Sequence, residues 1–328
     1  MSLSSMASPF ALALLVSFAL ALALGRPLIG YLASWKLGQI IREEGPQAHH
    51  AKAGTPSMGG WLFLIPAIVA TALFTPLVGE VFLLLLVILG YALVGFVDDY
   101  LIVKRRSNKG LSPRQKLAGQ IAVAVGFAVG LYMLNHGTSV ILPFTQGRGM
   151  LDLGLFYYPL LVFIMVGTTN AVNLTDGLDG LAAGTVAIAL AALGWVLLAY
   201  GHFSHLAGVE VLIAAFIGAL LGFLWYNCHP AQVFMGDTGS LALGAAVAGC
   251  AVVGRLEFWL IPIGAVFIAE TLSVMAQVLY FKRTGGKRLF KMSPLHHHFE
   301  LSGWKETKVV TRFYLAGAAC ALLAITLL

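Results

Sequence analysis

The sequence predicts an all-α, polytopic membrane protein, and three observations lead to this fold class. Hydrophobic residues make up 59% of the 328 residues, whereas charged residues make up only 10%. The mean hydropathy is +0.89. The apolar residues also form long runs, and roughly 20 apolar residues are enough for a helix to cross a bilayer. A soluble globular protein is therefore excluded, and we expect residues 1–328 to form a single transmembrane domain.

We expect about ten spanning helices, one for each apolar run of the chain. The runs are residues 9–33, 59–78, 81–97, 117–134, 155–173, 181–200, 208–225, 238–254, 258–280 and 309–328. The first run has no Lys or Arg before it and Lys36 after it, which is the reverse of a signal peptide, so we keep it as a span. The eighth run is short and rich in Gly and Ala, which let helices pack closely. We therefore expect this run inside the bundle.

The distribution of cations predicts the topology. Nearly all of the 20 Lys and Arg residues lie in loops that follow odd-numbered runs. Loops that follow even-numbered runs hold only Arg148 and Arg255, and Arg26 lies near the inner end of the first run. By the positive-inside rule, the odd loops face the cytoplasm and both termini lie outside. The net charge of +6 therefore reflects topology and does not indicate a nucleic-acid partner.

The longest external loop comprises residues 135–154. Within it, residues 139–143 have the composition of a short strand. This pattern predicts a small external hairpin, to which we assign no chemistry.

The third run ends on two adjacent aspartates, Asp98 and Asp99. Ionisable side chains at membrane depth are costly and usually serve a substrate or ion path. The alternative is a plain helix end with solvated carboxylates. The basic residues 104–106 that follow are typical of a segment that attracts lipid headgroups. Lys116 lies at the depth of the aspartates and could reach a phosphate as a point charge.

Four polar residues recur at every third position at the inner end of the fifth run: Asn170, Asn173, Asp176 and Asp179. If the helix continues through them, they form one polar stripe that faces a common cavity. Capping by Asn and Asp is the alternative, although it explains one or two such residues rather than four. The glycines that follow would let a ligand approach the backbone closely.

The segment from Asn227 to Ser240 carries no Lys or Arg although it lies in a predicted cytoplasmic loop. Asp237, which stands between two nearby glycines, suits a hard cation such as Mg²⁺ that is bound by one or two carboxylates and by ligand phosphates. Phe234 offers a ring on which a base can stack. A tight turn that begins with Asp is the alternative reading of Asp237.

Two further segments carry candidate ligand-binding groups. Residues 49–60 combine glycines with Lys52 and Ser57, a mixture that suits anionic oxygens, although an ordinary polar turn fits equally well. His296, His297 and His298 follow the long basic loop near Gln277. A zinc site is disfavoured because adjacent side chains point in different directions, so we expect hydrogen bonding to phosphate or acid–base assistance. We expect Glu270, which lies two turns deeper than Gln277, to pack inside the bundle.

These motifs, taken together, resemble the phospho-N-acetylmuramoyl-pentapeptide transferase family, within the superfamily of polyprenyl-phosphate N-acetylhexosamine-1-phosphate transferases. The matching strings are residues 49–60, 98–100 with 109–111, 170–180, 234–240 and 293–298. The resemblance runs from the first apolar run to the last, with every motif in order. Two departures are Ile102, where many members have Lys, and Ser57, where many have Thr.

The resemblance implies an activity, a cofactor and a setting. The implied reaction is a Mg²⁺-dependent transfer of phospho-MurNAc-pentapeptide from UDP-MurNAc-pentapeptide to undecaprenyl phosphate, which gives lipid I and UMP in peptidoglycan synthesis. The implied protein is a homodimer of ten-helix bundles in the bacterial cytoplasmic membrane. Its active site lies in a cleft that faces the cytoplasm.

The resemblance also implies roles for individual residues. Asp237 resembles the magnesium ligand, and Asp98 resembles a base or a nucleophile. Residues that resemble those needed for activity are Asp99, Lys116, Asn170, Asn173, Asp176 and His296. Residues that resemble the uridine pocket and its surroundings are Lys52, Gly177, Leu178, Asp179, Asn227, Phe234, Gln277 and His297. Ser57 is a further candidate for binding the substrate.

Two other functions fit part of the sequence. A sibling transferase would move GlcNAc-1-phosphate onto the same lipid, but such siblings usually carry an Arg-containing pattern where this chain has three histidines. An ion-coupled transporter would use the aspartates as a proton relay. That reading does not explain why the carboxylates gather at one face, and the chain shows no internal repeat.

Overall fold

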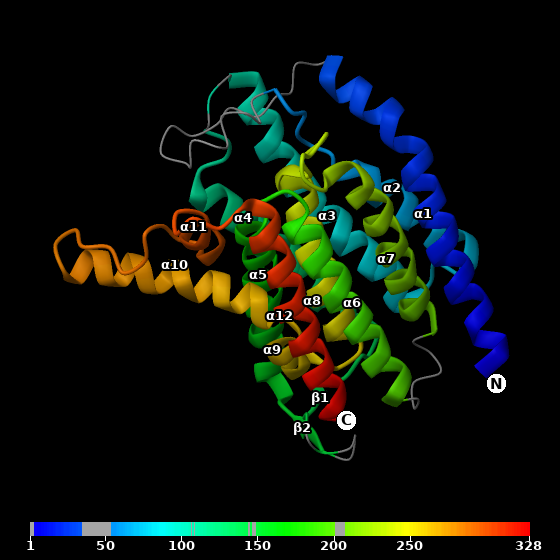
Figure 1. Ribbon diagram of the computed structural model, residues 1–328. Coiled ribbons are helices and arrows are strands. Elements are labelled where there is room, and N and C mark those ends of the chain that lie inside the picture. The colour runs from blue at the N-terminus through cyan, green and yellow to red at the C-terminus, as the bar shows by residue number, and fades with distance from the viewer. Residues whose placement is uncertain are drawn as a thin grey trace.

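The computed structural model describes residues 3–34, 54–105, 107, 109–143, 145, 149–200 and 207–328, with only the backbone for residues 3–8 and 207. Its long helices are α1 (Leu3–Ser34), α2 (Trp61–Phe74), α3 (Gly79–Arg105), α4 (Pro113–Met133), α5 (Tyr157–Thr175), α6 (Leu181–Tyr200), α7 (Ala207–Asn227), α8 (Gly236–Val253), α10 (Ala265–Arg283) and α12 (Glu306–Thr326). Two short helices are α9 (Leu260–Ile263) and α11 (Leu295–Glu300). Figure 1 shows these helices as one bundle.

In the described part of the chain, nine helices are long and apolar enough to cross a membrane. They confirm the predicted all-α membrane fold. The second run is the exception, because α2 has only 14 residues. At roughly 1.5 Å per residue it falls short of a hydrocarbon core of about 30 Å. The helix ends at Phe74 because Thr75, which precedes a proline, takes an extended conformation.

The ninth run also differs from the prediction, because it is not one helix. It forms a 3-10 turn (Glu257–Trp259), then α9, and then α10 after a break at Gly264. Gly264 is the C-cap of α9. Its N–H still donates to the carbonyl of Leu260, but its φ and ψ of −91° and 13° leave the helical region. As a result α10 runs across the direction of α12 and leaves the bundle sideways (Figure 1).

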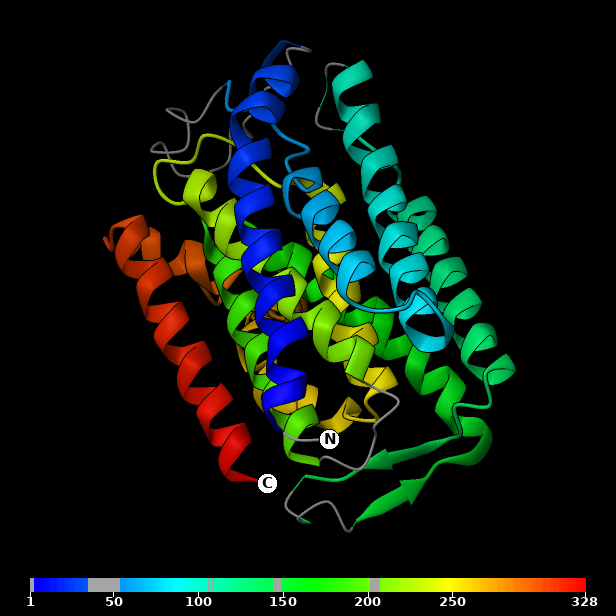
Figure 2. The ribbon, with the colours of Figure 1, turned by 90° about the vertical axis from the view of Figure 1, so that its right-hand side faces the viewer.

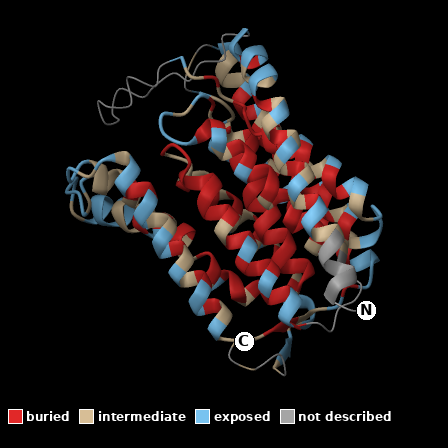
Figure 3. Ribbon diagram, turned by 45° about the vertical axis from the view of Figure 1, so that its right-hand side comes forward, coloured by how far each residue is buried: buried red, intermediate tan, exposed pale blue. Residues whose placement is uncertain are grey.

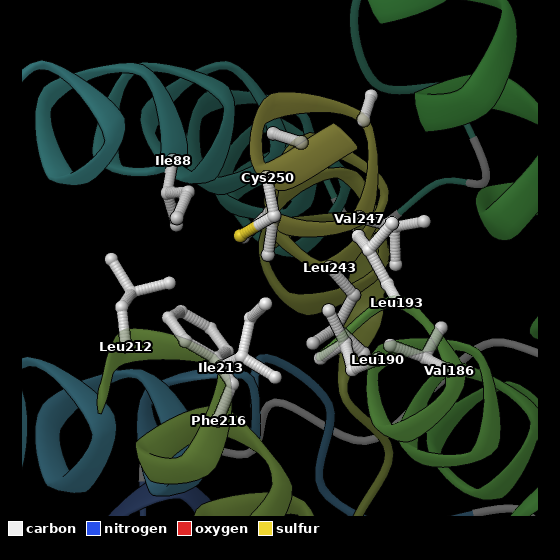
Figure 4. Close-up of a cluster of buried hydrophobic side chains, with 14 of the residues drawn as sticks. Ile88, Val186, Leu190, Leu193, Leu212, Ile213, Phe216, Leu243, Val247 and Cys250 are labelled. Atoms are coloured by element: carbon white, nitrogen blue, oxygen red, sulfur yellow. The ribbon is translucent and has the colours of Figure 1, made fainter. Parts of the chain in front are cut away.

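Helix α8 lies at the centre of the bundle. Every residue from Thr238 to Val253 is buried, and Figure 3 shows the surrounding buried interior. Leu243 and Val247 of α8 meet side chains of α6 and α7, with Ile88 of α3 beside Cys250 (Figure 4). The small residues of α8 let its neighbours approach, which confirms the prediction of a packed interior helix. By contrast, large apolar side chains such as Leu73, Met133 and Phe163 are exposed on the outside of the bundle, as a protein in lipid requires.

The predicted hairpin is present. Strands β1 (Ser139–Ile141) and β2 (Met150–Asp152) pair antiparallel, with Ser139 opposite Asp152. The N–H of Ile141 donates to the carbonyl of Arg255 at 2.8 Å, so the hairpin is tied to the turn after α8. Figure 1 and Figure 2 show the start of α1, the end of α12 and this hairpin at the same end of the bundle. The predicted grouping of the termini with the hairpin is therefore observed.

A buried carboxyl group lies near this hairpin end. Glu257 is only 3% exposed, and no hydrogen-bond partner reaches its carboxylate oxygens in the described residues. Burial raises the pKa of Glu257 from its ordinary value of 4.5 to about 7, although Tyr157 and Arg255 nearby oppose the shift. The protonated form of Glu257 is therefore the one that the fold accommodates.

We predict that Glu257→Gln stabilises the protein at pH 8 but not at pH 5. Because the folded state raises the pKa, it holds the proton more tightly than the unfolded chain. This contribution to stability is full below pH 4.5 and is lost as pH rises through about 7. The loss is on the order of 2–3 kcal/mol, and Gln avoids it because it has no charge.

The measurement is the thermal unfolding midpoint of the detergent-solubilised protein at both pH values. Asp152→Asn is the control, because the exposed Asp152 accepts hydrogen bonds that lower its pKa. That variant should give no gain at pH 8. Equal midpoints for Glu257→Gln and wild type at pH 8 would contradict the prediction.

Candidate active site

Asp98 and Asp99 lie within α3 rather than at its end, because the helix continues to Arg105. Both side chains are buried, with 7% and 6% exposure. A solvated helix end is therefore ruled out for this pair. Buried carboxylates need compensating donors or charges, and each aspartate finds a different set.

Asp99 binds the N-terminus of α8. Its Oδ1 accepts the N–H of Asp237 at 3.0 Å, and its Oδ2 accepts the N–H and the hydroxyl of Thr238 at 2.9 and 2.6 Å. These are among the N–H groups that a helix leaves without an intrahelical partner, and the positive end of the helix dipole favours the carboxylate. The close approach requires Gly95, because a Cβ there would collide with the backbone of Asp237. Asp99 therefore fixes where Asp237 lies.

Asp98 faces the centre of the site. Its Oδ1 accepts the N–H of Leu111 at 2.7 Å, so the loop after α3 folds back over the carboxylate. Arg105 holds this loop by donating to the carbonyl of Gly110 at 3.0 Å. Asp98 is also close enough to Asp237 and Lys116 to interact with both electrostatically. Two carboxylates thus meet at one point, where a positive charge is needed.

Asp237 is the point at which four helices converge. Lys116 of α4 forms an ion pair with Oδ2 of Asp237. Asn173 of α5 donates to Oδ1 at 2.7 Å and to the hydroxyl of Ser240 at 2.8 Å. Lys116 is in place because α4 begins with a capping box in which Ser112 and Gln115 bond reciprocally. The predicted association of Asp98, Asp99, Lys116, Asn173 and Asp237 is observed.

The predicted stripe of four polar residues is not formed, because α5 ends at Thr175 and Asp176 is its C-cap. Asn170 bonds instead to Gln120 of α4, at 2.7 Å, and to the carbonyl of Val166. Asp179 lies beyond the helix and bonds to another segment. Of the four residues, only Asn173 is bonded to Asp237.

His296 is completely buried. Its ring Nδ1 lies 3.2 Å from Oε2 of Glu270, and its backbone N–H donates to Oε1 of Glu270 at 3.3 Å. The ring packs on Gly177, where any Cβ would collide with Nε2. Glu270 is buried inside the bundle as predicted, but its contact with His296 was not foreseen.

The other two histidines take separate partners. Nδ1 of His297 lies 2.9 Å from Oε2 of Glu300, and Nδ1 of His298 accepts the N–H of Lys291 at 3.2 Å. None of the three histidines belongs to a potential metal-binding group in the part of the chain that the structure describes.

Gln277 uses its amide to hold the loop before the histidines. Its Oε1 accepts the N–H groups of Leu289 and Phe290 at 3.0 and 2.9 Å, and its Nε2 donates to the carbonyl of Phe290. It also lines a pocket of about 420 Å³ between α10 and this loop. The lining residues are Gln277, Val278, Phe281, Lys282, Arg288, Met292 and Ser293. The pocket therefore combines apolar surface with two cationic side chains.

The segments before α2 and α8 lie against each other. The N–H of Gly59 donates to the carbonyl of Phe234 at 2.8 Å, and the N–H of Phe234 donates to the carbonyl of Pro56 at 2.8 Å. This pairing holds Phe234 by its backbone while its side chain stays half-buried. Ser57 lies beside Gly236, at the start of α8. Lys52 lies outside the described residues.

Asn227 connects two loops of the site. Its Oδ1 accepts the N–H of Gly180 at 3.1 Å, and its Nδ2 donates to the carbonyl of Val233 at 2.8 Å. It is 3% exposed, so it supports the predicted pocket from within the fold. Leu178 is also buried, in a small apolar cluster with Leu181 and Val309.

Comparison with known proteins places the chain in a family. Residues 81–255, which include Asp98, Asn173 and Asp237, match the family described as glycosyl transferase family 4. The phospho-N-acetylmuramoyl-pentapeptide-transferase of Halalkalibacterium halodurans is 50% identical over 321 residues, which cover 96% of both chains. The protein of that name from Bacillus subtilis is 49% identical over 316 residues, or 95% of both chains. The chain belongs to the phospho-N-acetylmuramoyl-pentapeptide-transferase family. This result confirms the resemblance and does not favour the sibling or transporter readings.

Sequence reasoning did not single out several residues that build the site. The most important are Leu111 and Thr238, which bond to Asp98 and Asp99. For Glu270, the sequence predicted burial but not the contact with His296. Thr238 follows Asp237 directly at the start of a helix. The free N–H groups of a helix start need an acceptor, and this signal predicts that a carboxylate lies next to Thr238. The contacts of Leu111 and Glu270 carry no local sequence signal.

We predict that Asp98→Asn and Asp99→Asn have opposite effects on stability. Asp99→Asn replaces one acceptor oxygen by an NH₂ group that faces donors, which should destabilise the protein by about 1–3 kcal/mol. Asp98→Asn removes repulsion with Asp237, so stability should stay equal or rise while activity is lost. Thermal unfolding midpoints and turnover, measured side by side, check both variants. A larger loss of stability in Asp98→Asn than in Asp99→Asn would refute this assignment.

Proposed function

We propose that this protein transfers phospho-MurNAc-pentapeptide from UDP-MurNAc-pentapeptide to undecaprenyl phosphate, with lipid I and UMP as products. The observation that carries the proposal is the cluster of Asp98, Asp237 and Lys116, which lies at the junction of four helices in a bundle with an apolar exterior. The names of the relatives specify the phospho-N-acetylmuramoyl-pentapeptide group. The lipid acceptor and the release of UMP follow from the family resemblance.

The position of the cluster suits a reaction between a soluble and a lipid substrate. It lies near the end of α3 and the start of α4, next to the cationic loop that holds Arg105 and Lys109. By the positive-inside rule this end faces the cytoplasm of a bacterial cell, and the hairpin and both termini lie outside. We also expect a homodimer, as the family resemblance implies.

We propose Mg²⁺ as the cofactor, with Asp237 as its ligand. The residues present fit this ion, because the carboxylates of Asp98 and Asp237 face each other and Mg²⁺ prefers oxygen ligands of this kind. When bound, the ion would offset negative charge on the donor pyrophosphate and on the leaving UMP.

The side chains of the chain itself supply the remaining functions. Lys116 would hold phosphate oxygens as a point charge. Asp98 would remove the proton of the lipid phosphate and so permit direct attack on the donor. Oε2 of Glu270 lies 3.2 Å from Nδ1 of His296, and Nε2 of the same ring is directed toward Gly177. Phe234, Gly177, Leu178 and Asp179 would receive the uridine.

The decisive test supplies purified protein and labelled undecaprenyl phosphate with either UDP-MurNAc-pentapeptide or UDP-GlcNAc. We expect lipid product and UMP only with the muramoyl donor. Asp237→Asn should reduce turnover below about 1% of wild type, because it removes charge where the transition state needs it. Transfer from UDP-GlcNAc alone would replace the proposal by the sibling activity. Near-normal turnover of Asp237→Asn at ordinary Mg²⁺ would refute the role of Asp237.

The role of Asp98 as a base gives a separate prediction. Undecaprenyl phosphate loses its second proton with a pKa near 6, so raising the pH should partly rescue Asp98→Asn. A nucleophilic Asp98 would instead carry the phospho-sugar itself, and no pH could replace it. Rapid-quench assays of lipid-free protein with the UDP donor distinguish the two roles. A stoichiometric burst of UMP that vanishes in Asp98→Asn would establish the nucleophile.

A further inference from the structure

Three titratable side chains form a second cluster, apart from the three aspartates. Asp179 comes from the loop after α5, His229 from the segment before α8, and Glu306 from the first turn of α12. Nδ1 of His229 lies 2.9 Å from Oδ2 of Asp179 and 3.4 Å from Oε2 of Glu306. We call this group the Asp179–His229–Glu306 cluster. It joins three segments that are far apart in the sequence.

The cluster fixes Asp179 through both its side chain and its backbone. Oδ2 of Asp179 accepts from His229 and also from the N–H of Ala231 at 3.1 Å. The N–H of Asp179 donates to Oε1 of Glu306 at 2.8 Å. The side chain of Asp179 is 1% exposed and that of Glu306 is 10% exposed. Two buried carboxylates this close repel each other, and Nδ1 of His229 lies within 3.4 Å of both.

The neighbours of Asp179 are held in the same way. The N–H of Gly180 donates to Asn227, and the hydroxyl of Tyr314 donates to the carbonyl of Gly180 at 2.6 Å. At the other end of this stretch, Gly177 contacts His296. Residues 177–180 therefore run from the buried histidine of the active site to the Asp179–His229–Glu306 cluster, with contacts at both ends.

The ligand atoms of the cluster lie within 4.8 Å of one another, a spacing that a divalent cation could also use. However, Oδ2 of Asp179 already accepts two hydrogen bonds from the protein, and Oε1 of Glu306 accepts one. A charge-assisted network of this kind is held together by its own donors. The geometry therefore favours a positioning role over a metal site.

We propose that His229 and Glu306 are positioning residues that hold the segment of residues 177–179 in the shape that binds the nucleotide of the donor. This inference rests on the proposed function, because it assigns the segment to the uridine. Neither residue touches the reacting atoms, so their loss should weaken nucleotide binding and leave the chemical step intact. His229 is also the accessible member, with its side chain 42% exposed, so it can be replaced with little disturbance of the core.

The test compares His229→Ala, His229→Gln and Glu306→Gln with wild type. For His229→Ala we expect the KM for the UDP donor and the Kd for UMP to rise about tenfold, the effect of one lost hydrogen bond to a charged group. The kcat and the KM for undecaprenyl phosphate should stay within about twofold. His229→Gln keeps an N–H donor and should recover most of the binding. Glu306→Gln keeps an acceptor for the N–H of Asp179 and should have an intermediate effect.

Asp152→Asn, in the hairpin at the opposite end, is the matched control and should change none of these values. A fall in kcat with unchanged UMP binding would overturn the inference. A lower thermal unfolding midpoint in His229→Ala that His229→Gln does not restore would also overturn it. The inference and the proposed function can fail separately. If wild type transfers nothing but binds UMP, and His229→Ala weakens that binding, only the proposed transfer fails. If wild type is active and His229→Ala binds UMP normally, only the positioning role fails.

Discussion

The hydrogen bonds that Asp99 accepts from the start of α8 determine where most of the site lies. A carboxylate inside the bundle is costly unless donors compensate it, and the first turn of α8 supplies three donors, two of them backbone N–H groups. The same contact brings α3 and α8 together at Gly95 and directs Asp237 toward Lys116 and Asn173. Asp99 therefore has a structural role, whereas its neighbour Asp98 lies near the carboxylate of Asp237 and the charge of Lys116.

The two adjacent aspartates contact different parts of the structure. Successive side chains on a helix point about 100° apart, so Asp98 and Asp99 reach different groups of Asp237: Asp99 accepts its backbone N–H, whereas Asp98 lies near its carboxylate. Asp99 faces the interior helix, and Asp98 faces the loop at Leu111 and the centre of the site. Asp98 and Asp237 remain close, and the charge of Lys116 offsets part of their repulsion.

The sequence predicted the class of fold and the members of the central cluster, because both depend on local signals. Runs of apolar residues indicate spans, and polar residues at the same depth of neighbouring spans must lie near one another. The errors occurred where a single backbone position decides the outcome. Helix α2 stops before Pro76, α5 stops at Thr175, and Gly264 divides the ninth run. Apolar periodicity shows none of these breaks. Contacts such as Glu270 with His296 depend on the path of α10, which only the folded chain reveals.

The break at Gly264 has a consequence for the site as a whole. Because α10 leaves the bundle sideways (Figure 1), the loop after it can return with α11 and bring His296 against Gly177. Glu270, on the buried side of α10, then contacts this histidine. A straight ninth helix would carry Glu270 and the histidine segment along the bundle axis instead. The bend thus joins the segment of residues 177–180 to the histidines, and the Asp179–His229–Glu306 cluster holds the far end of the same segment. The position of His296 and that of the Asp179–His229–Glu306 cluster are therefore connected through four residues of backbone.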